Sequence, residues 1–135
     1  MGLIDDLATV AGPAQVLTGA DMARYARDWM GKYQGAPLAV VRPGSTAEVS
    51  ACVRIAAAHG VAIVPVSGNT GLVGGTMTTG GVMISLERMN RIRAVKRDAR
   101  LVVAEAGVIL SRLHEAAEAE GTLGIITAAV MKLVP

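Results

Sequence analysis

A glycine-rich stretch at residues 67–75 contains the residue types best suited to bind a ligand. It holds four glycines and no charged side chain, together with Ser67, Asn69 and Thr70. Successive backbone N–H groups in such a loop can converge on one anion, and these three side chains add further donors. Because no Lys or Arg accompanies them, attraction must come from oriented amides, which suits a pyrophosphate held in a buried groove.

The glycine spacing separates this loop from two common nucleotide-binding motifs. A P-loop requires a Lys after its last glycine, and none follows here. A Rossmann loop requires G-x-G-x-x-G and then a helix, whereas this loop reads G-x-x-G-x-x-G and residues 76–81 have no helical period. Glu87 follows about 20 residues later, where a ribose-binding acid would stand. A Rossmann-like NAD site is therefore a weaker alternative, and a glycine-rich connection without a ligand is another.

Short apolar strands and a helix are predicted on both sides of the loop. The strands are expected at 38–41, 61–66 and 81–86. The spacing of Ser45 and Glu48 is a capping box and predicts a helix between the first two strands. Because a helix joins them, these two strands should run parallel as a βαβ unit.

The remaining segments extend this pattern toward both ends of the chain. A helix is predicted over 18–33, because Asp21 lies three residues after Thr18 and apolar residues then recur at helical spacing. The third strand should be followed by a hairpin at 92–106, by a helix after Gly107, and by an apolar strand-like segment at 123–134. The predicted fold class is α+β, with a small parallel βαβ lobe and a second, antiparallel lobe. Val49, Cys52, Val53 and Ala56 are expected to form a buried stripe in the first helix, and Leu110, Leu113 and Ala117 to share one face of the second.

Composition indicates a folded chain of one domain. The 135 residues are 52% apolar and 18% charged, and the net charge of +2 is spread along the sequence. Without a basic run or stacking aromatics, nucleic acid is not an expected partner. The single cysteine suits a reducing compartment, no apolar run could cross a bilayer, and the N-terminus does not resemble a secretion signal. The expected location is the cytoplasm.

Other reactive residues have plainer explanations than chemistry. Arg42 and Arg88 could reach a phosphate and Glu87 a ribose, but solvated surface charges are the favoured interpretation. The two histidines, His59 and His114, lack metal-ligand spacing and are expected to be solvated helix residues. No catalytic residue and no metal site is therefore assigned within this chain.

The motifs resemble one known family. The loop from Pro65 to Gly75 resembles the pyrophosphate loop of the vanillyl-alcohol-oxidase (PCMH-type) FAD-binding oxidoreductases. Its Gly-Asn-Thr-Gly-Leu-Val-Gly-Gly sequence is most similar to the D-2-hydroxyglutarate and D-lactate dehydrogenase branch. Further segments resemble that family in the same order, at residues 36–43, 84–92, 104–108 and 121–127.

The resemblance implies a partial PCMH-type FAD-binding domain at 36–135, preceded by a helical lead-in at 1–35. Asn69 stands where some relatives carry a histidine bonded to the flavin, so the FAD should be non-covalent. The resemblance implies that the pyrophosphate contacts Gly68, Asn69, Thr70, Gly71 and Leu72. It implies that the loop is shaped by Pro65, Ser67 and Gly75, and that Ile125 contacts the cofactor through its backbone.

The chain departs from the family at residues 119–121. There the helix after Gly107 runs straight into the 121–127 segment, which implies an internal deletion or a chimeric gene model. The family's cap domain, with its catalytic histidines and metal, is also not within the sequence. The resemblance thus implies the FAD-binding portion of an oxidoreductase acting on a D-2-hydroxy acid in the intact parent.

The isolated chain is expected to have no turnover and to expose strand edges that could self-associate. An inactive remnant of a deleted gene is the alternative function that the sequence leaves open.

Overall fold

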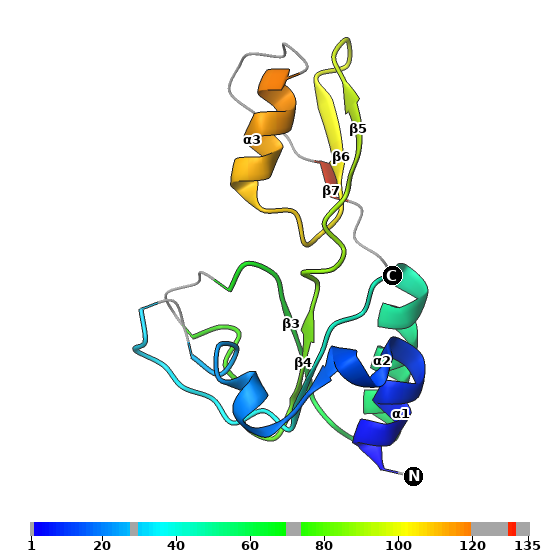
Figure 1. Ribbon diagram of the computed structural model, residues 1–135, viewed down its shortest axis with the longest axis vertical. Helices are drawn as coiled ribbons and strands as arrows, with labels where there is room; N and C mark the ends of the chain where they lie inside the picture. The colour runs from blue at the N-terminus through cyan, green and yellow to red at the C-terminus, as the bar shows by residue number, and fades with distance from the viewer. Residues whose placement is uncertain (1, 28–29, 70–73, 120–129, 132–135) are drawn as a thin grey trace.

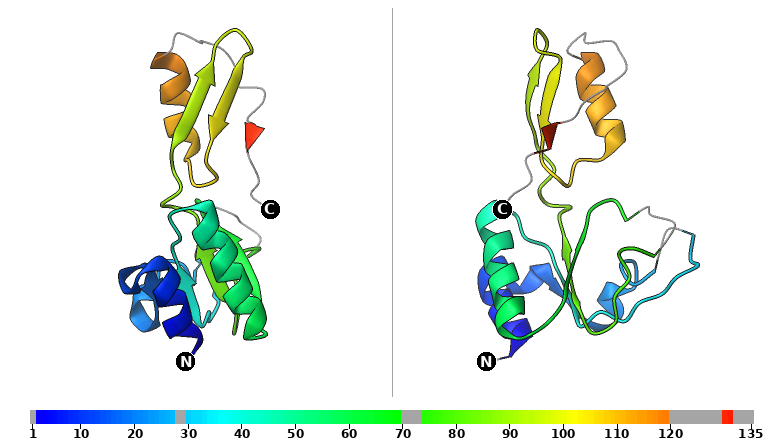
Figure 2. Two further views of the ribbon diagram at one scale, coloured as in Figure 1. Left: turned by 90° about the vertical axis from the view of Figure 1, so that its right-hand side faces the viewer. Right: turned by 180° about the vertical axis from the view of Figure 1, so that it is seen from behind.

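The structure is a computed structural model of the chain, and it describes residues 2–27, 30–69, 74–119 and 130–131. Two lobes lie one above the other along the long axis (Figure 1). The first lobe carries a four-stranded sheet and the second a three-stranded sheet. Figure 2 shows both lobes from two further sides, with the N-terminus at the far end of the first lobe.

The first sheet confirms the predicted parallel βαβ unit. Its strand order is β1-β2-β4-β3, and both β2 and β3 pair in parallel with β4, which lies between them. β1 pairs antiparallel with β2 at one edge. The strands are β1 (Val16–Leu17), β2 (Ala39–Val41), β3 (Ile63–Val66) and β4 (Val82–Ser85).

The two faces of this sheet are covered differently. Helices α1 (Leu3–Ala11) and α2 (Thr46–Ala58) pack on one face, where Leu7 of α1 and Cys52 of α2 are fully buried. On the other face, Tyr25 packs on Val40. Figure 1 shows the 3-10 helix η2 (Gly19–Met22) on the side of the sheet opposite to α1 and α2, and Val66, the last residue of β3, belongs to the same cluster as Tyr25.

Helix α2 begins and ends as its sequence predicts. The Glu48 N–H donates to the Ser45 hydroxyl at 3.2 Å, and the Glu48 carboxylate accepts from the Gly44 N–H at 2.6 Å. Gly60, at a φ of +67°, follows the last turn in the left-handed conformation that glycine favours. The predicted buried stripe is wrong at Val53, whose side chain is 39% exposed, because one position after Cys52 lies about 100° round the helix.

Cys52 is a core residue, as predicted, and burial raises the pKa of its thiol. The thiol therefore stays protonated and contributes to packing.

The helix predicted over 18–33 is wrong in its described part. A short 3-10 helix, η2 (Gly19–Met22), is followed by turns, and Arg27 then pairs with Gln34 in an antiparallel bridge. Tyr25 is only 4% exposed because it packs on the sheet, and this tertiary contact overrides the helical spacing. The lead-in instead contains α1 and a second 3-10 helix, η1 (Pro13–Gln15), neither of which was predicted.

The second lobe contains the predicted hairpin and helix. β5 (Ile92–Lys96) and β6 (Leu101–Ala104) are antiparallel, and Leu113 of α3 (Leu110–Ala119) packs on β6. Of the three residues expected to share one face of α3, Leu113 and Ala117 are buried and Leu110 is 63% exposed. β7 (Val130–Met131) pairs in parallel with β6, so this sheet is mixed and not wholly antiparallel. The proposed junction at 119–121 is outside the described residues except for its first position.

Two close contacts join the lobes next to the glycine loop. The Ser67 hydroxyl donates to the carbonyl of Ala106 at 2.8 Å, and the Gly107 N–H donates to the carbonyl of Met89 at 2.8 Å. A Cβ atom on Gly107 would lie 1.9 Å from the Leu86 carbonyl oxygen. Only glycine allows the backbones to approach this closely.

Candidate cofactor site

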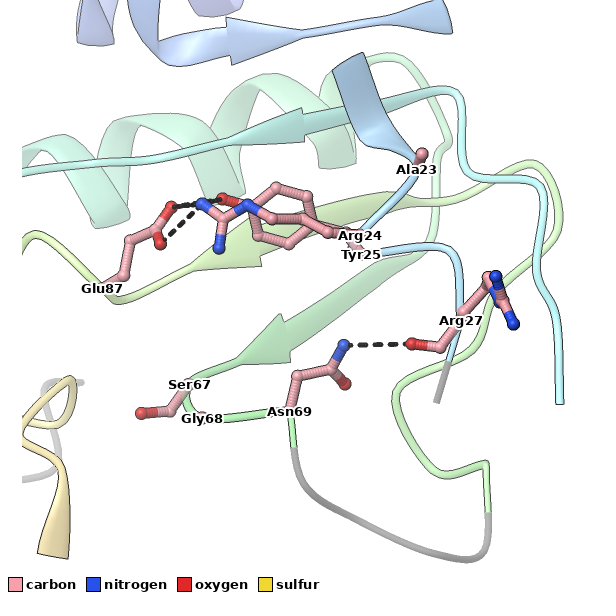
Figure 3. Close-up of a pocket in the computed structure, with 8 residues that line it drawn as sticks. All are labelled: Ala23, Arg24, Tyr25, Arg27, Ser67, Gly68, Asn69 and Glu87. Carbon is pink, nitrogen blue, oxygen red and sulfur yellow. Dashed lines mark hydrogen bonds and ion pairs between the residues drawn. The ribbon is translucent and has the colours of Figure 1, made fainter. Parts of the chain in front are cut away.

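A pocket of about 430 Å³ opens where β3 ends and the glycine loop begins. Ligands of parallel sheets commonly bind outside the carboxyl ends of the strands, which is where this pocket lies. Segments far apart in the sequence line it (Figure 3): Ala23, Arg24, Tyr25, Arg27, Ser67, Gly68, Asn69 and Glu87.

The loop backbone has the features that an anion-binding loop needs. Asn69, at a φ of +53°, and Gly74, at +71°, turn the chain in the left-handed conformation. Among the described residues, no atom of a non-neighbouring residue lies within 4 Å of the positions that a Cβ would take on Gly68 or Gly75. Neither the Gly68 nor the Asn69 backbone N–H donates to another residue in the described ranges. Free donors beside open space fit a pyrophosphate group.

The side chains of the loop are used within the protein. The Asn69 carbonyl oxygen accepts from the Thr76 hydroxyl at 2.6 Å, and its amide nitrogen donates to the Arg27 carbonyl at 3.4 Å. Ser67 is bonded to Ala106 of the second lobe. These bonds fix Ser67 and Asn69, and they leave the backbone N–H groups of Gly68 and Asn69 as the donors that the described part of the loop can offer to a ligand.

The structure places only some of the residues that the sequence assigns to the cofactor. Ser67, Gly68 and Asn69 line the pocket. Pro65 lies in β3 opposite Ile84, and Gly75 lies in an exposed turn. Four assigned residues lie outside the described ranges: Thr70, Gly71, Leu72 and Ile125.

Glu87 forms the opposite wall with both carboxylate oxygens engaged. Nη2 of Arg24 donates to these oxygens at 3.1 and 2.9 Å, and the Tyr25 hydroxyl donates to the same carboxylate. Nη1 of Arg42 lies 3.8 Å from Oε1 of Glu87. Glu87 follows the end of β4 and is 31% exposed, as expected of a strand-end acid, and its ion pair with Arg24 is the feature that the sequence does not indicate.

The surrounding cations determine the charge state of this cluster. Burial alone would raise the pKa of Glu87, but the hydrogen bonds from Tyr25 and Arg24 and the charges of Arg24 and Arg42 outweigh it and lower the pKa below its ordinary value. Burial, with the hydrogen bond to Glu87, raises the pKa of Tyr25. At neutral pH the cluster therefore holds a carboxylate and a neutral phenol that donates to it.

The two arginines considered as phosphate contacts are used elsewhere. Nη2 of Arg42 donates to the Ala14 carbonyl at 2.9 Å, and Nη1 of Arg88 donates to the Arg42 carbonyl at 2.7 Å. Arg42 is partly buried and ion-paired with Glu87, so its interpretation as a solvated charge is wrong. Neither residue lines the pocket.

The histidines occupy structural positions away from the pocket. Nε2 of His59 lies 2.8 Å from a carboxylate oxygen of Asp6, which ties the end of α2 to α1. His114 is exposed on α3. The described part of the chain contains no cluster of three metal-binding side chains. In the same ranges, no helix is long and apolar enough to cross a membrane.

The Glu87 cluster predicts a pH-dependent effect of the Glu87→Gln substitution. The folded-state pKa of Glu87 is lowered, so its stabilising effect is complete above the unfolded value of about 4.3 and is lost as pH falls through the folded value. Urea unfolding should show the variant less stable than the wild type at pH 7, with a smaller difference at pH 4. Glu115→Gln, at an exposed site on α3, should leave the unfolding midpoint unchanged at both pH values. A Glu87→Gln deficit that is equal at pH 7 and pH 4 would contradict the ion-pair argument.

The half of the pocket that residues 23–27 contribute is not predicted from the sequence. These residues fall within the helix expected over 18–33, and no local pattern connects them with Glu87. The pairing of Arg24 and Tyr25 with an acid more than 60 positions away depends on the fold. A Tyr between two Arg in an otherwise apolar segment is the one signal that could have indicated it.

Comparison with known proteins supports the same assignment. A family model described as FAD binding domain matches residues 37–132. The chain is 40% identical over 121 residues to the D-2-hydroxyglutarate dehydrogenase of Stutzerimonas stutzeri (strain A1501), covering 88% of this chain and 26% of that protein. It is 37% identical over 114 residues to the D-lactate dehydrogenase of Anaerostipes hadrus, covering 82% and 24%. This chain thus spans about a quarter of the length of these relatives.

Solved structures show the same fold. 4-Ethylphenol oxidase from Gulosibacter chungangensis matches with a TM-score of 0.78 and 31% identity, over 88% of this chain and 24% of that one. p-Cresol methylhydroxylase matches with a TM-score of 0.75 and 21% identity, again over 88% of this chain and 24% of that one. At this identity the match shows the fold alone.

These findings decide between the alternatives for the loop. Residues 74–81 contain a turn, a β-bridge at Thr79 and bends, and not the helix that a Rossmann site requires. The expected PCMH-type fold, partial domain and FAD cofactor are confirmed. From the matched region and from the identity to its relatives, this chain belongs to the family of FAD binding domains.

Proposed function

We propose that this chain binds FAD without a covalent bond and holds its pyrophosphate against the loop at 67–75. The observation that carries the proposal is the open space beside Gly68, next to backbone N–H groups without a partner in the described residues. A carboxamide cannot form the bond that a histidine forms with flavin, so Asn69 favours non-covalent binding.

The proposed roles divide the loop into contacts and supports. The backbone from Gly68 to Leu72 contacts the pyrophosphate, and Ile125 adds a backbone contact. Pro65, Ser67 and Gly75 shape the loop. The bond from Ser67 to Ala106 supports that division, because it fixes the start of the loop and uses the serine hydroxyl.

The activity proposed for the intact protein is the oxidation of a D-2-hydroxy acid. FAD, when bound, supplies the hydride acceptor N5 for the substrate α-carbon. The similarity to a D-2-hydroxyglutarate dehydrogenase and a D-lactate dehydrogenase supports this substrate class. This chain spans about a quarter of those proteins, so we propose that it positions the cofactor and has no turnover alone. A dye-reduction assay with D-lactate or D-2-hydroxyglutarate tests that point, and reduction above background would contradict it.

Three further features remain proposals. The cytoplasm is the proposed location, and the single cysteine supports it. An internal deletion at 119–121 is proposed from the motif order. Self-association is proposed through β1 and β3, which are the outer strands of the first sheet in the described residues.

An absorption measurement tests cofactor binding. The purified chain should be mixed with FAD, desalted and scanned for the absorption bands of flavin, with riboflavin as the matched ligand that lacks a pyrophosphate. We expect the protein to retain the FAD bands near equal stoichiometry and to lose riboflavin, because the proposed contacts are to the pyrophosphate. A folded, colourless protein would favour the alternative, an inactive remnant.

A further inference from the structure

Half of the pocket wall comes from a segment that precedes the matched family region. The family match begins at residue 37, whereas Ala23, Arg24, Tyr25 and Arg27 line the pocket together with the glycine loop. The segment faces the loop across the pocket (Figure 3). No part of the family assignment gives this segment a role at the cofactor.

Side-chain contacts at both ends hold the segment against the loop. At one end, the Glu87 carboxylate accepts hydrogen bonds from Arg24 and Tyr25. At the other end, the Asn69 amide donates to the Arg27 carbonyl. The Tyr25 ring is buried on the sheet between these two contacts, and the Arg24 guanidinium lies 4.3 Å from its centroid. The segment is therefore fixed at its start, its middle and its end.

The segment also supplies the charge that the loop lacks. The loop at 67–75 has no Lys or Arg, and the pocket-lining cations are Arg24 and Arg27. Arg24 pairs with Glu87, and the Arg27 guanidinium points away from Asn69, toward Gly31 (Figure 3). The charge of Arg27 therefore adds long-range attraction for a pyrophosphate and no direct contact.

We propose that residues 23–27 form a wall of the FAD site facing the pyrophosphate loop, and that Glu87 is the positioning residue that holds this wall in place. The proposal rests on the proposed binding of FAD. We assign Glu87 to the wall and not to the ribose, because both of its carboxylate oxygens accept hydrogen bonds from Arg24 or Tyr25. In this arrangement the segment before the family domain belongs to the binding site.

Hydrogen–deuterium exchange with and without FAD tests the wall directly. In the wild type, FAD should slow amide exchange both at 23–27 and at 67–69. In Glu87→Gln, FAD should still slow exchange at 67–69 but much less at 23–27, with an FAD dissociation constant about tenfold higher. Glu87→Asp, which keeps the charge, should recover part of the affinity. Asp6→Asn removes a carboxylate from the ion pair with His59, away from the pocket, and should behave as the wild type.

The outcomes separate this inference from the proposed function. If FAD protects 67–69 but not 23–27 in the wild type, the wall is wrong while FAD binding stands. If Glu87→Gln lowers stability but keeps full protection of both segments, Glu87 is not a positioning residue for the site. If FAD protects neither segment and is lost on desalting, the proposed function fails and the inference falls with it. The wild-type measurement decides the wall even if Glu87→Gln does not fold.

Discussion

Replacing Gly107 with alanine should lower the free energy of unfolding by about 3 kcal/mol or more, at the upper end of what overpacking costs. The new methyl group would lie 1.9 Å from the Leu86 carbonyl oxygen and 2.7 Å from that of Met89. Both neighbours are backbone atoms just after β4, and the Gly107 N–H is itself bonded to Met89. Relief therefore requires the two lobes to separate locally.

Urea unfolding followed by circular dichroism measures this effect. Gly75→Ala is the matched control, because its methyl group would meet no atom within 4 Å and its backbone is not left-handed. The control should unfold near the wild-type midpoint, and Gly107→Ala should unfold at much lower urea. Equal midpoints for the two variants would show that the close approach of the lobes is not present in solution.

The same substitution should also affect the cofactor site. The Ser67 hydroxyl is bonded to the carbonyl of Ala106, the residue before Gly107. Moving the second lobe therefore releases the start of the glycine loop. FAD retention should fall together with stability in Gly107→Ala, which distinguishes it from a substitution in the loop itself.

Helix α2 shows what local sequence signals can predict. Its N-terminal cap at Ser45, its acidic partner Glu48 and its terminating Gly60 all lie within or next to the helix. Capping and left-handed glycine are short-range effects, so no tertiary information is needed. The strands on either side of α2 were also predicted, because short apolar runs bounded by turn residues are typical of buried strands.

The segment at 18–27 shows where local signals fail. Met22 and Tyr25 have helical spacing, but they pack on the sheet from a 3-10 turn and an irregular stretch. The free energy of that burial exceeds the small preference for helix. Conversely, α1 was not predicted, although its Leu7 is fully buried beside α2. Which face of a segment finds a partner is decided by residues far away in the sequence.

The site follows the same division between local and distant effects. A loop without charge that presents N–H groups can be recognised from glycine content, and Gly68 and Asn69 lie at the pocket as expected. The role of Glu87 could not be predicted, because Arg24 and Tyr25 reach it only when the chain before β2 folds across the sheet. The position of β4 between β2 and β3 is likewise set by pairing across the fold.

Replacing Gly68 with alanine should separate cofactor binding from stability. In the described part of the chain no non-neighbouring atom lies within 4 Å of the added methyl group, and the Gly68 backbone is not left-handed, so the apo protein should tolerate it. Removing a glycine also lowers the entropy of the unfolded chain, which would stabilise the fold by about 0.4–1 kcal/mol. The unfolding midpoint without FAD should therefore be equal to the wild-type value or slightly higher.

FAD affinity should nevertheless fall by at least about tenfold in Gly68→Ala, because the methyl group would occupy the space through which the pyrophosphate approaches the backbone. Titration of the protein with FAD, followed by flavin fluorescence, measures the dissociation constant. Gly2→Ala is the control, since its methyl group would have no contact closer than 4.0 Å and the site is in the N-terminal segment before α1. Weaker binding with unchanged stability would mean that the open space beside Gly68 is occupied by the cofactor. Unchanged binding in Gly68→Ala would mean that the pyrophosphate is held elsewhere, and the loop would then serve only to connect β3 with β4.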